Sequence, residues 1–204
     1  KEKYCLRLSE IRLDKRKAAG ILQIGIPSAF QYSLFAFANL FVQSSVNSFD
    51  HVLVEGNSAA ANADPLVYDM MAAFYTACSS FIAQNFGARK KKRILQTYLI
   101  CLFYSFITSL VLGVGIYLAR YPFLYLFTSD KAVVEAGITR LSIMALSYSA
   151  SAFMDASIAA SRGLGKTAVP TVVVVMGSCV FRIIWIYTIF AYFHTIQSLY
   201  ILYV

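Results

Sequence analysis

The chain has 204 residues, of which 59% are hydrophobic and 14% are charged, and its formal net charge is +8. A soluble domain carries about 25% charged residues, so this composition argues against a soluble protein and predicts a membrane protein. The cations gather at two places, with seven of the 18 Lys and Arg in residues 1–17 and five in residues 89–93. Such clustering is typical of membrane topology and gives no reason to expect nucleic acid as a partner.

Five apolar segments are long enough to cross a lipid bilayer, which takes about 20 residues each. They cover residues 24–47, 58–84, 95–118, 138–161 and 168–192. Cation-rich connections alternate with cation-poor ones, and by the positive-inside rule the cation-rich ones are cytoplasmic. These are residues 1–17, 85–94 and 162–167. The sequence therefore predicts an all-α polytopic membrane helix bundle, residues 18–204, preceded by a cytoplasmic basic linker, residues 1–17.

The long connection 119–137 is predicted to hold a short interfacial helix at residues 121–127, followed by helix-capping residues at 128–130. Residues 195–204 have the composition of the approach to a sixth helix. The chain begins with Lys rather than Met, so we expect it to be a piece of a longer protein.

The first span carries a slowly winding polar stripe, formed by Gln31, Asn39, Gln43 and Asn47. The stripe could line an aqueous cavity, or it could make hydrogen bonds to neighbouring helices, as Asn and Gln often do in membrane bundles. Both interpretations stay open at this point.

Four ionisable side chains lie within the spans, namely Asp64, Asp69, Asp155 and Arg182. A charge at a helix centre costs about 2.5–3.5 kcal/mol on insertion scales, so each should have a partner or water. Depth along the helices pairs Arg182 with Asp69 better than with Asp155. Asp155 is then the best candidate for a carboxylate that faces a cavity and titrates, with Asp64 second. A structural ion pair or a solvated cavity wall is the alternative for each.

No motif for catalysis or metal binding is complete. The four cysteines form no Cys-x-x-Cys pair, and His51 and His194 lie in separate connections. Residues 165–167, Gly-Lys-Thr, match the last three residues of a phosphate-binding loop motif. The first glycine of that motif is replaced by Ala160, so the motif is incomplete. We expect no enzyme, no catalytic residue, no metal and no cofactor.

The run of residues 77–88, Ala-Cys-Ser-Ser-Phe-Ile-Ala-Gln-Asn-Phe-Gly-Ala, resembles a signature of the multidrug and toxic compound extrusion (MATE) family. Three more blocks resemble the same half of that family in the same order: residues 25–28 with Asn39 and Asn47, residues 126–130, and residues 162–166 with Pro170, Gly177 and Arg182. The resemblance covers nearly the whole chain, matches the C-terminal lobe and is of bacterial type.

The resemblance implies a transporter with two six-helix lobes, which exports drugs and organic cations in exchange for H+ or Na+. This chain would supply five transmembrane helices of the C-terminal lobe, and its partners would be the lipid bilayer, small organic cations and the missing N-terminal lobe. The resemblance also implies that the protein is located in the bacterial plasma (inner) membrane. Some family members couple transport to a cation through an acidic residue on the helix that corresponds to the one with Asp155. The candidates for binding ion or substrate are Asp155, Asp64, Asp69, Gln31, Asn39 and Gln43.

Two alternatives stay open: a lipid-linked oligosaccharide flippase of the same superfamily, and a membrane fragment that does not transport. A flippase would be expected to line its cavity with cations for a pyrophosphate group. The spans of this chain hold three acids and one Arg, which favours cationic substrates.

Overall fold

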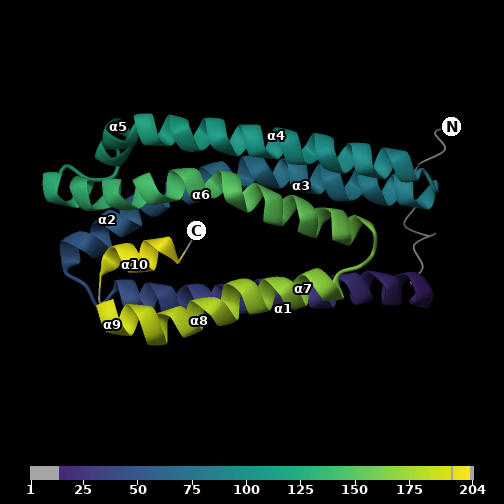
Figure 1. Cartoon of the computed structure of the whole chain (residues 1–204), viewed down its shortest axis with the longest axis horizontal. Helices are drawn as coiled ribbons and strands as arrows, with labels where there is room; N and C mark the ends of the chain where they lie inside the picture. The colour runs from purple at the N-terminus through teal and green to yellow at the C-terminus, as the bar shows by residue number, and fades with distance from the viewer. Residues whose placement is uncertain (1–13, 194, 203–204) are drawn as a thin grey trace, which may run out of the picture.

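The computed structural model describes residues 14–193 and 195–202, and this part of the chain is helical almost throughout (Figure 1). Five helical segments are long and apolar enough to cross a membrane: residues 15–46, 51–87, 91–118, 131–163 and 168–193. The predicted all-α class and the five predicted spans are thereby confirmed. Most of the basic linker 1–17, together with Cys5 and His194, lies outside the described residues.

The first four spans are built from five helices, and a short sixth helix, α5, lies between the third and fourth spans. They are α1 (Lys15–Val46), α2 (His51–Ala61), α3 (Ala63–Gly87), α4 (Lys91–Leu118), the short α5 (Arg120–Tyr125) and α6 (Lys131–Gly163). The helices α2 and α3 follow each other directly and together form the second span. The predicted interfacial helix at 121–127 corresponds to α5.

The fifth span alternates between α-helix and π-helix. Its parts are α7 (Ala168–Val174), the π-helical η2 (Val175–Val180), α8 (Phe181–Trp185), the π-helical η3 (Ile186–Phe190) and α9 (Ala191–Phe193). A last helix, α10 (Ile196–Ile201), lies where the sequence predicts the approach to a sixth helix.

Two aspartates set the beginnings of long helices. The Asp14 carboxylate accepts hydrogen bonds from the backbone N–H groups of Arg16 and Lys17, which have no partner within α1. Asp130 caps α6 in the same way by accepting from the N–H of Ala132 at 2.8 Å. Capping at Asp130 agrees with the prediction, but α6 then begins seven residues before the predicted start at residue 138.

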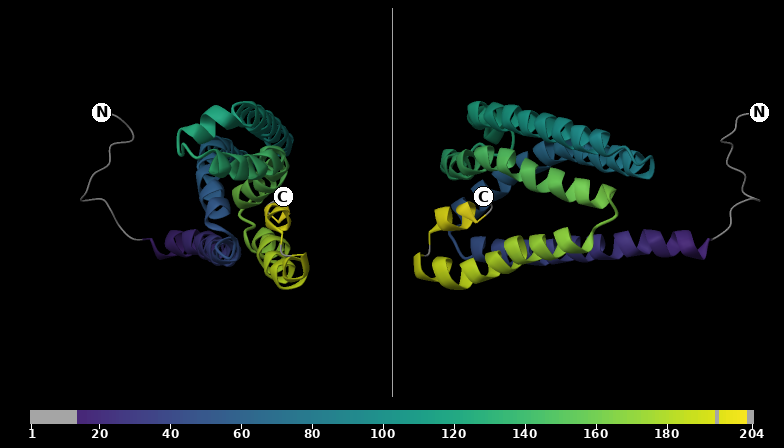
Figure 2. Two further views of the ribbon diagram at one scale, coloured as in Figure 1. Left: turned by 90° about the vertical axis from the view of Figure 1, so that its left-hand side faces the viewer. Right: turned by 45° about the vertical axis from the view of Figure 1, so that its right-hand side comes forward.

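The helices fall into two groups. Figure 1 shows α3, α4 and α6 on one side of the molecule and α1, α7 and α8 on the other, and Figure 2 shows the same division from two further directions. Within the first group, buried residues such as Val67, Met71 and Tyr148 form an apolar core. A separate core joins Val46 of α1, Phe190 of the fifth span and Leu199 of α10. This division positions the cavity described below.

Small residues let α4 approach α6 closely. The buried residues of α4 are Ser105, Ser109 and Gly113, which recur every four residues and so lie on one face. A Cβ atom added to Gly113 would lie 2.3 Å from the backbone oxygen of Ala145 in α6. Close helix packing through small residues is a common device in membrane bundles.

We expect Gly113→Ala to destabilise the protein by about 1–3 kcal/mol, because the added methyl group forces the backbones of α4 and α6 apart. Gly115→Ala is the matched control on the same helix, since a Cβ there meets nothing within 4 Å. Alanine also favours the helix, so this control should melt at or slightly above the wild-type temperature. Equal melting temperatures of the two detergent-purified variants would contradict the packing argument.

Candidate functional site

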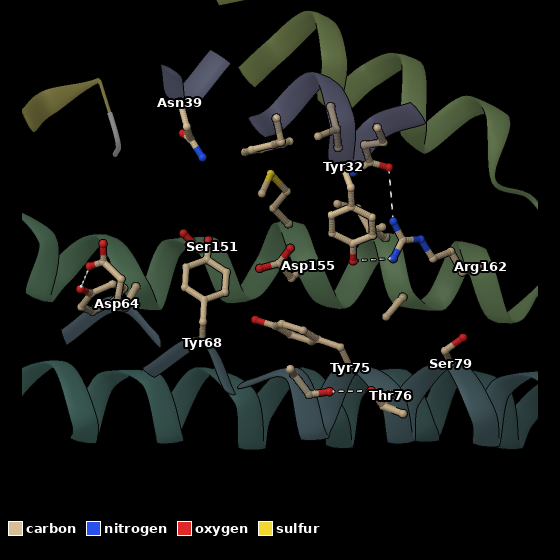
Figure 3. Close-up of a pocket in the computed structure, with 18 of the residues that line it drawn as sticks. Tyr32, Asn39, Asp64, Tyr68, Tyr75, Thr76, Ser79, Ser151, Asp155 and Arg162 are labelled. Atoms are coloured by element: carbon tan, nitrogen blue, oxygen red, sulfur yellow. Dashed lines mark hydrogen bonds between the residues drawn. The ribbon is translucent and has the colours of Figure 1, made fainter. Parts of the chain in front are cut away.

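A cavity of about 940 Å³ lies between the two groups of helices. One wall comes from α3 and α6, and the other comes from α1 and the fifth span. The close-up in Figure 3 shows Asp64, Tyr68, Tyr75, Asp155 and Arg162 distributed along this cavity.

The wall formed by α6 is a stripe at helical spacing. Its residues follow the helical repeat, which places them on one side of the helix: Met144, Ser147, Tyr148, Ser151, Met154, Asp155, Ile158, Ala159 and Arg162. Small residues at Ser147 and Ser151 leave room in front of the acid. The Ser-rich and Ala-rich composition of this span therefore serves both packing and cavity volume.

Asp155, the first candidate of the sequence analysis, lines the cavity and lies near the middle of the view in Figure 3. Its Oδ2 atom and the hydroxyl of Tyr75 are both buried, and the two side chains interact with each other, although neither atom makes a hydrogen bond of good geometry within the described residues. Figure 3 shows the Asp155 carboxylate between the rings of Tyr68 and Tyr75 on one side and Tyr32 on the other. A carboxylate in this setting can accept a proton, a metal cation or an organic cation.

Asp64, the second candidate, also lines the cavity, but it is held in an ion pair. Arg140 Nη2 donates to Asp64 Oδ2 at 2.7 Å, and the Tyr148 hydroxyl donates to Asp64 Oδ1. Arg140 is only 3% exposed, so this pair is removed from solvent on the arginine side. The sequence analysis misses this pair because it starts the helix at residue 138; the Asp130 cap places Arg140 nine residues inside α6.

The predicted ion pair between Arg182 and Asp69 is wrong. Arg182 Nη1 donates to Asn39 Oδ1 at 2.7 Å, whereas Asp69 is exposed and does not line the cavity. Depth along a helix does not fix the direction in which a side chain points. Asp69 is one residue beyond Tyr68, which faces the cavity, and one residue turns the helix by about 100°.

The polar stripe of α1 serves both roles that the sequence leaves open. Gln31 and Asn39 line the cavity, and Gln31 Oε1 accepts from Thr171 Oγ1 at 3.3 Å. Gln43 is not part of the lining, and its amide donates to Asn47 within the same helix at 2.9 Å. Of the three candidates on α1, two are therefore in the site and Gln43 is not.

Arg162 is a cavity residue that the sequence analysis assigns to a cytoplasmic connection. It belongs to the last turn of α6 and donates to the Tyr32 hydroxyl at 3.3 Å and to Gln31 Oε1 at 3.4 Å. Its guanidinium carbon lies 5.4 Å from the centre of the Tyr32 ring. The seven-residue spacing from Asp155 could have indicated this position, because two helical turns bring a residue back to the same face.

The described residues contain no cluster of three or more His, Cys, Asp or Glu side chains that could hold a metal ion. The chemistry offered by the cavity is therefore that of single charges, amides, hydroxyl groups and aromatic rings. Such a set can bind a small molecule.

The chain is similar in sequence to one protein family and to a curated protein. A family model described as MatE matches residues 27–188. A protein of Shewanella oneidensis named "FAD transporter" is 25% identical over 134 residues, which are 66% of this chain and 29% of that protein. The chain thus spans less than a third of the length of this curated relative.

Solved structures share the fold. A crystal structure of a MATE mutant superposes with a TM-score of 0.83 at 19% identity, covering 97% of this chain and 44% of that one. A MOP superfamily transporter from Pyrococcus furiosus gives a TM-score of 0.71 at 21% identity, covering 90% of this chain and 40% of that one. The arrangement of helices in this chain corresponds to less than half of each of these proteins.

Proposed function

The chain belongs to the MatE family of membrane transporters, and from this premise we propose that it is the C-terminal lobe of a secondary antiporter. In this proposal the complete protein also has an N-terminal lobe. It exports organic cations from a bacterial cell across the plasma membrane, in exchange for H+ or Na+. In this proposal residues 1–17, 85–94 and 162–167 lie on the cytoplasmic side, as their cations favour, and the side chain of Arg162 turns back into the cavity.

The difference between two acids supports this proposal. Among the described residues, Asp155 lies in the cavity beside Tyr75 with Oδ2 buried and has no ion-pair partner, whereas Asp64 is held by Arg140 and Tyr148. An antiporter needs a carboxylate that can be occupied either by the coupling ion or by the substrate. A carboxylate in a short ion pair cannot change its occupant without breaking that pair, so Asp155 is the better choice.

The surroundings of Asp155 suit such an exchange. Tyr68 and Tyr75 line the cavity beside it, and aromatic ring faces attract organic cations. Binding of H+ or Na+ at Asp155 removes the negative charge that attracts a cationic substrate, so loading the ion favours release of the substrate. Exchange requires that the two loaded forms prefer different conformations of the lobes.

The substrate class has a second candidate. The acids and cations that line the cavity are Asp64, Asp155, Arg162 and Arg182, so the excess of acids found in the sequence does not describe the cavity itself. The curated relative is named "FAD transporter". FAD itself is an anionic aromatic compound. Export of an aromatic metabolite with an acidic group is therefore the second candidate, ahead of a lipid-linked sugar flippase.

The proposal is tested with inside-out membrane vesicles that contain the complete transporter, using ethidium as the cationic probe. We expect ethidium accumulation when a proton gradient or a Na+ gradient is imposed, and collapse of accumulation when an ionophore removes that gradient. Vesicles without the protein are the control. Ethidium uptake at the control rate under both gradients would contradict cation antiport, and inhibition of uptake by FAD would favour the second candidate.

A further inference from the structure

We propose that the turn between α3 and α4 binds the headgroup of an anionic phospholipid. The turn holds five consecutive cations, residues 89–93, and these same five residues line a hollow of about 430 Å³. This cation hollow shares no residue with the large cavity described above. The proposal therefore goes beyond the transport function and does not depend on it.

The five cations carry a charge that the described chain does not balance. No ion pair joins any of them to a described residue, and the sequence has no acid between Asp69 and Asp130. The first turn of α4, which begins within the cluster at Lys91, has no acid either. Like charges this close together repel each other. An anion bound among them would relieve this repulsion.

Arg89 has a backbone conformation that normally belongs to glycine. Its φ angle is 58°, and it is the only described residue other than glycine with a positive φ. At the end of α3 the N–H of Lys90 donates to the carbonyl oxygen of Asn85 at 2.9 Å, and the N–H of Arg89 donates to that of Phe86 at 3.0 Å. In this type of helix ending, glycine usually occupies the position of Arg89. A cation thus stands where glycine would cost less, which favours a role for its charge.

The cation hollow is joined to an exposed apolar face of α4. Leu95, Leu99 and Phe103 recur every four residues, so they form a stripe along one side of the helix, and each is more than half exposed. Lys91 lies one turn before Leu95 on the same side. Cations at one end of an apolar stripe match a phospholipid, whose phosphate would meet the cations while its acyl chains lie along the stripe.

The position of the turn favours a lipid over a soluble anion. Figure 1 shows α3 and α4 side by side, and they belong to consecutive spans, so the turn that joins their ends lies at the level of the membrane surface. A soluble phosphate would use the cations alone, whereas a phospholipid uses both the cations and the stripe. The positive-inside rule accounts for cations at this end of the spans. It does not require them to line one hollow, or one of them to take the conformation of glycine.

The test measures lipid binding at this site in the complete protein. A Leu99→Trp variant places a tryptophan in the apolar stripe, and phospholipids with brominated acyl chains quench its fluorescence on contact. Quenching is measured in mixed bilayers of phosphatidylglycerol and phosphatidylcholine, with either lipid brominated, and the signal of the protein without this substitution is subtracted. We expect phosphatidylglycerol to bind at least about tenfold more strongly than phosphatidylcholine, because each cation at the membrane surface contributes about fivefold. Equal binding of the two lipids would overturn the proposal.

The double substitution Lys91→Gln and Lys92→Gln, added to the tryptophan variant, identifies the cations responsible. It should lower the preference for phosphatidylglycerol by at least about fivefold. The matched control is Lys15→Gln with Lys17→Gln, because these are two exposed cations at the start of α1 that do not line the hollow. The control should keep the preference within about twofold. An unchanged preference in the first variant, or an equal fall in the control, would overturn the proposal.

Arg89→Gly separates the charge from the conformation of the turn. Glycine relieves the strain at this position, so the detergent-purified variant should melt about 2–4 °C above the wild type. In the tryptophan background the same substitution should lower the preference for phosphatidylglycerol by about fivefold. A lower melting temperature with an unchanged lipid preference would mean that Arg89 serves the fold, and would overturn its part in the site.

Glycerol 3-phosphate distinguishes a lipid site from a general phosphate site. This soluble compound has a phosphate group but no acyl chains. At millimolar concentration it should leave the quenching by brominated phosphatidylglycerol unchanged, because it gains nothing from the apolar stripe. Loss of quenching on its addition would show that the cation hollow binds soluble phosphates, and would overturn the assignment to a lipid.

Discussion

Replacing Asp155 by Asn in the complete transporter will reduce gradient-driven export to the level of vesicles without the protein, while the amount of protein in the membrane stays unchanged. Asn has nearly the same shape, so the cavity keeps its form and α6 keeps its packing. What is lost is the negative charge and the capacity to take up a proton, and both are required if one group binds ion and substrate in turn. The measurement is dye accumulation in inside-out vesicles under an imposed gradient, normalised to the protein content of the membrane.

Asp69→Asn is the matched control for this experiment. The substitution is chemically the same and also lies in a span, but Asp69 is exposed and outside the cavity. It should leave gradient-driven export close to the wild-type rate. Asp155→Glu keeps the charge and should retain part of the activity. If Asp155→Asn exported dye at the wild-type rate under a measured gradient, Asp155 would have no place in coupling.

The fold could be predicted from the sequence because the signals for membrane helices are long and redundant. An apolar run of about 20 residues gives a span whatever its neighbours are, and the five cations at 89–93 mark the end of one such run. Even the short helix α5 and the cap at Asp130 follow from local chemistry. These features depend on residues close together in the chain.

The site could be predicted only in part, since a cavity depends on direction around each helix as well as depth. The sequence points to Asp155 as a cavity-facing acid and leaves the role of Asn39 open, and both residues line the cavity, whereas the side chain of Asp69 lies about 100° away from that of Tyr68 and does not. The sequence analysis does not predict that Arg162 lines the cavity. The positive-inside rule explains a cation at that helix end completely, and so gives no sign that its side chain turns back toward Tyr32.

The pairing of Asp64 shows a further limit. Its partner Arg140 is 76 residues away in the sequence, and the predicted start at residue 138 places Arg140 at the end of the span instead of nine residues inside α6. Helix boundaries are the least certain part of a sequence-based assignment, and here the boundary decided whether an ion pair could be recognised. The stability that this ion pair contributes can be measured by removing Arg140.

We expect Arg140→Met to destabilise the protein by about 3 kcal/mol, because it leaves the Asp64 carboxylate without its charged partner. Breaking a buried pair costs about 3–5 kcal/mol, and the lower figure applies because the Asp64 side chain is 28% exposed toward the cavity. The melting temperature of the detergent-purified protein should fall by about 6–12 °C if the usual scaling holds. Lys131→Met, an exposed cation at the start of the same helix, is the matched control and should melt at the wild-type temperature.

A double variant separates the charge from the shape of Arg140. Adding Asp64→Asn to Arg140→Met removes the unpaired carboxylate and keeps an oxygen that can accept the Tyr148 hydroxyl, so most of the lost stability should return. If the double variant melts as low as Arg140→Met alone, the loss comes from the missing arginine stem and not from the charge on Asp64. If Arg140→Met melts like the wild type, the pair contributes little to stability. Recovered stability with export still driven by the gradient would assign Asp64 a structural role and leave coupling to Asp155.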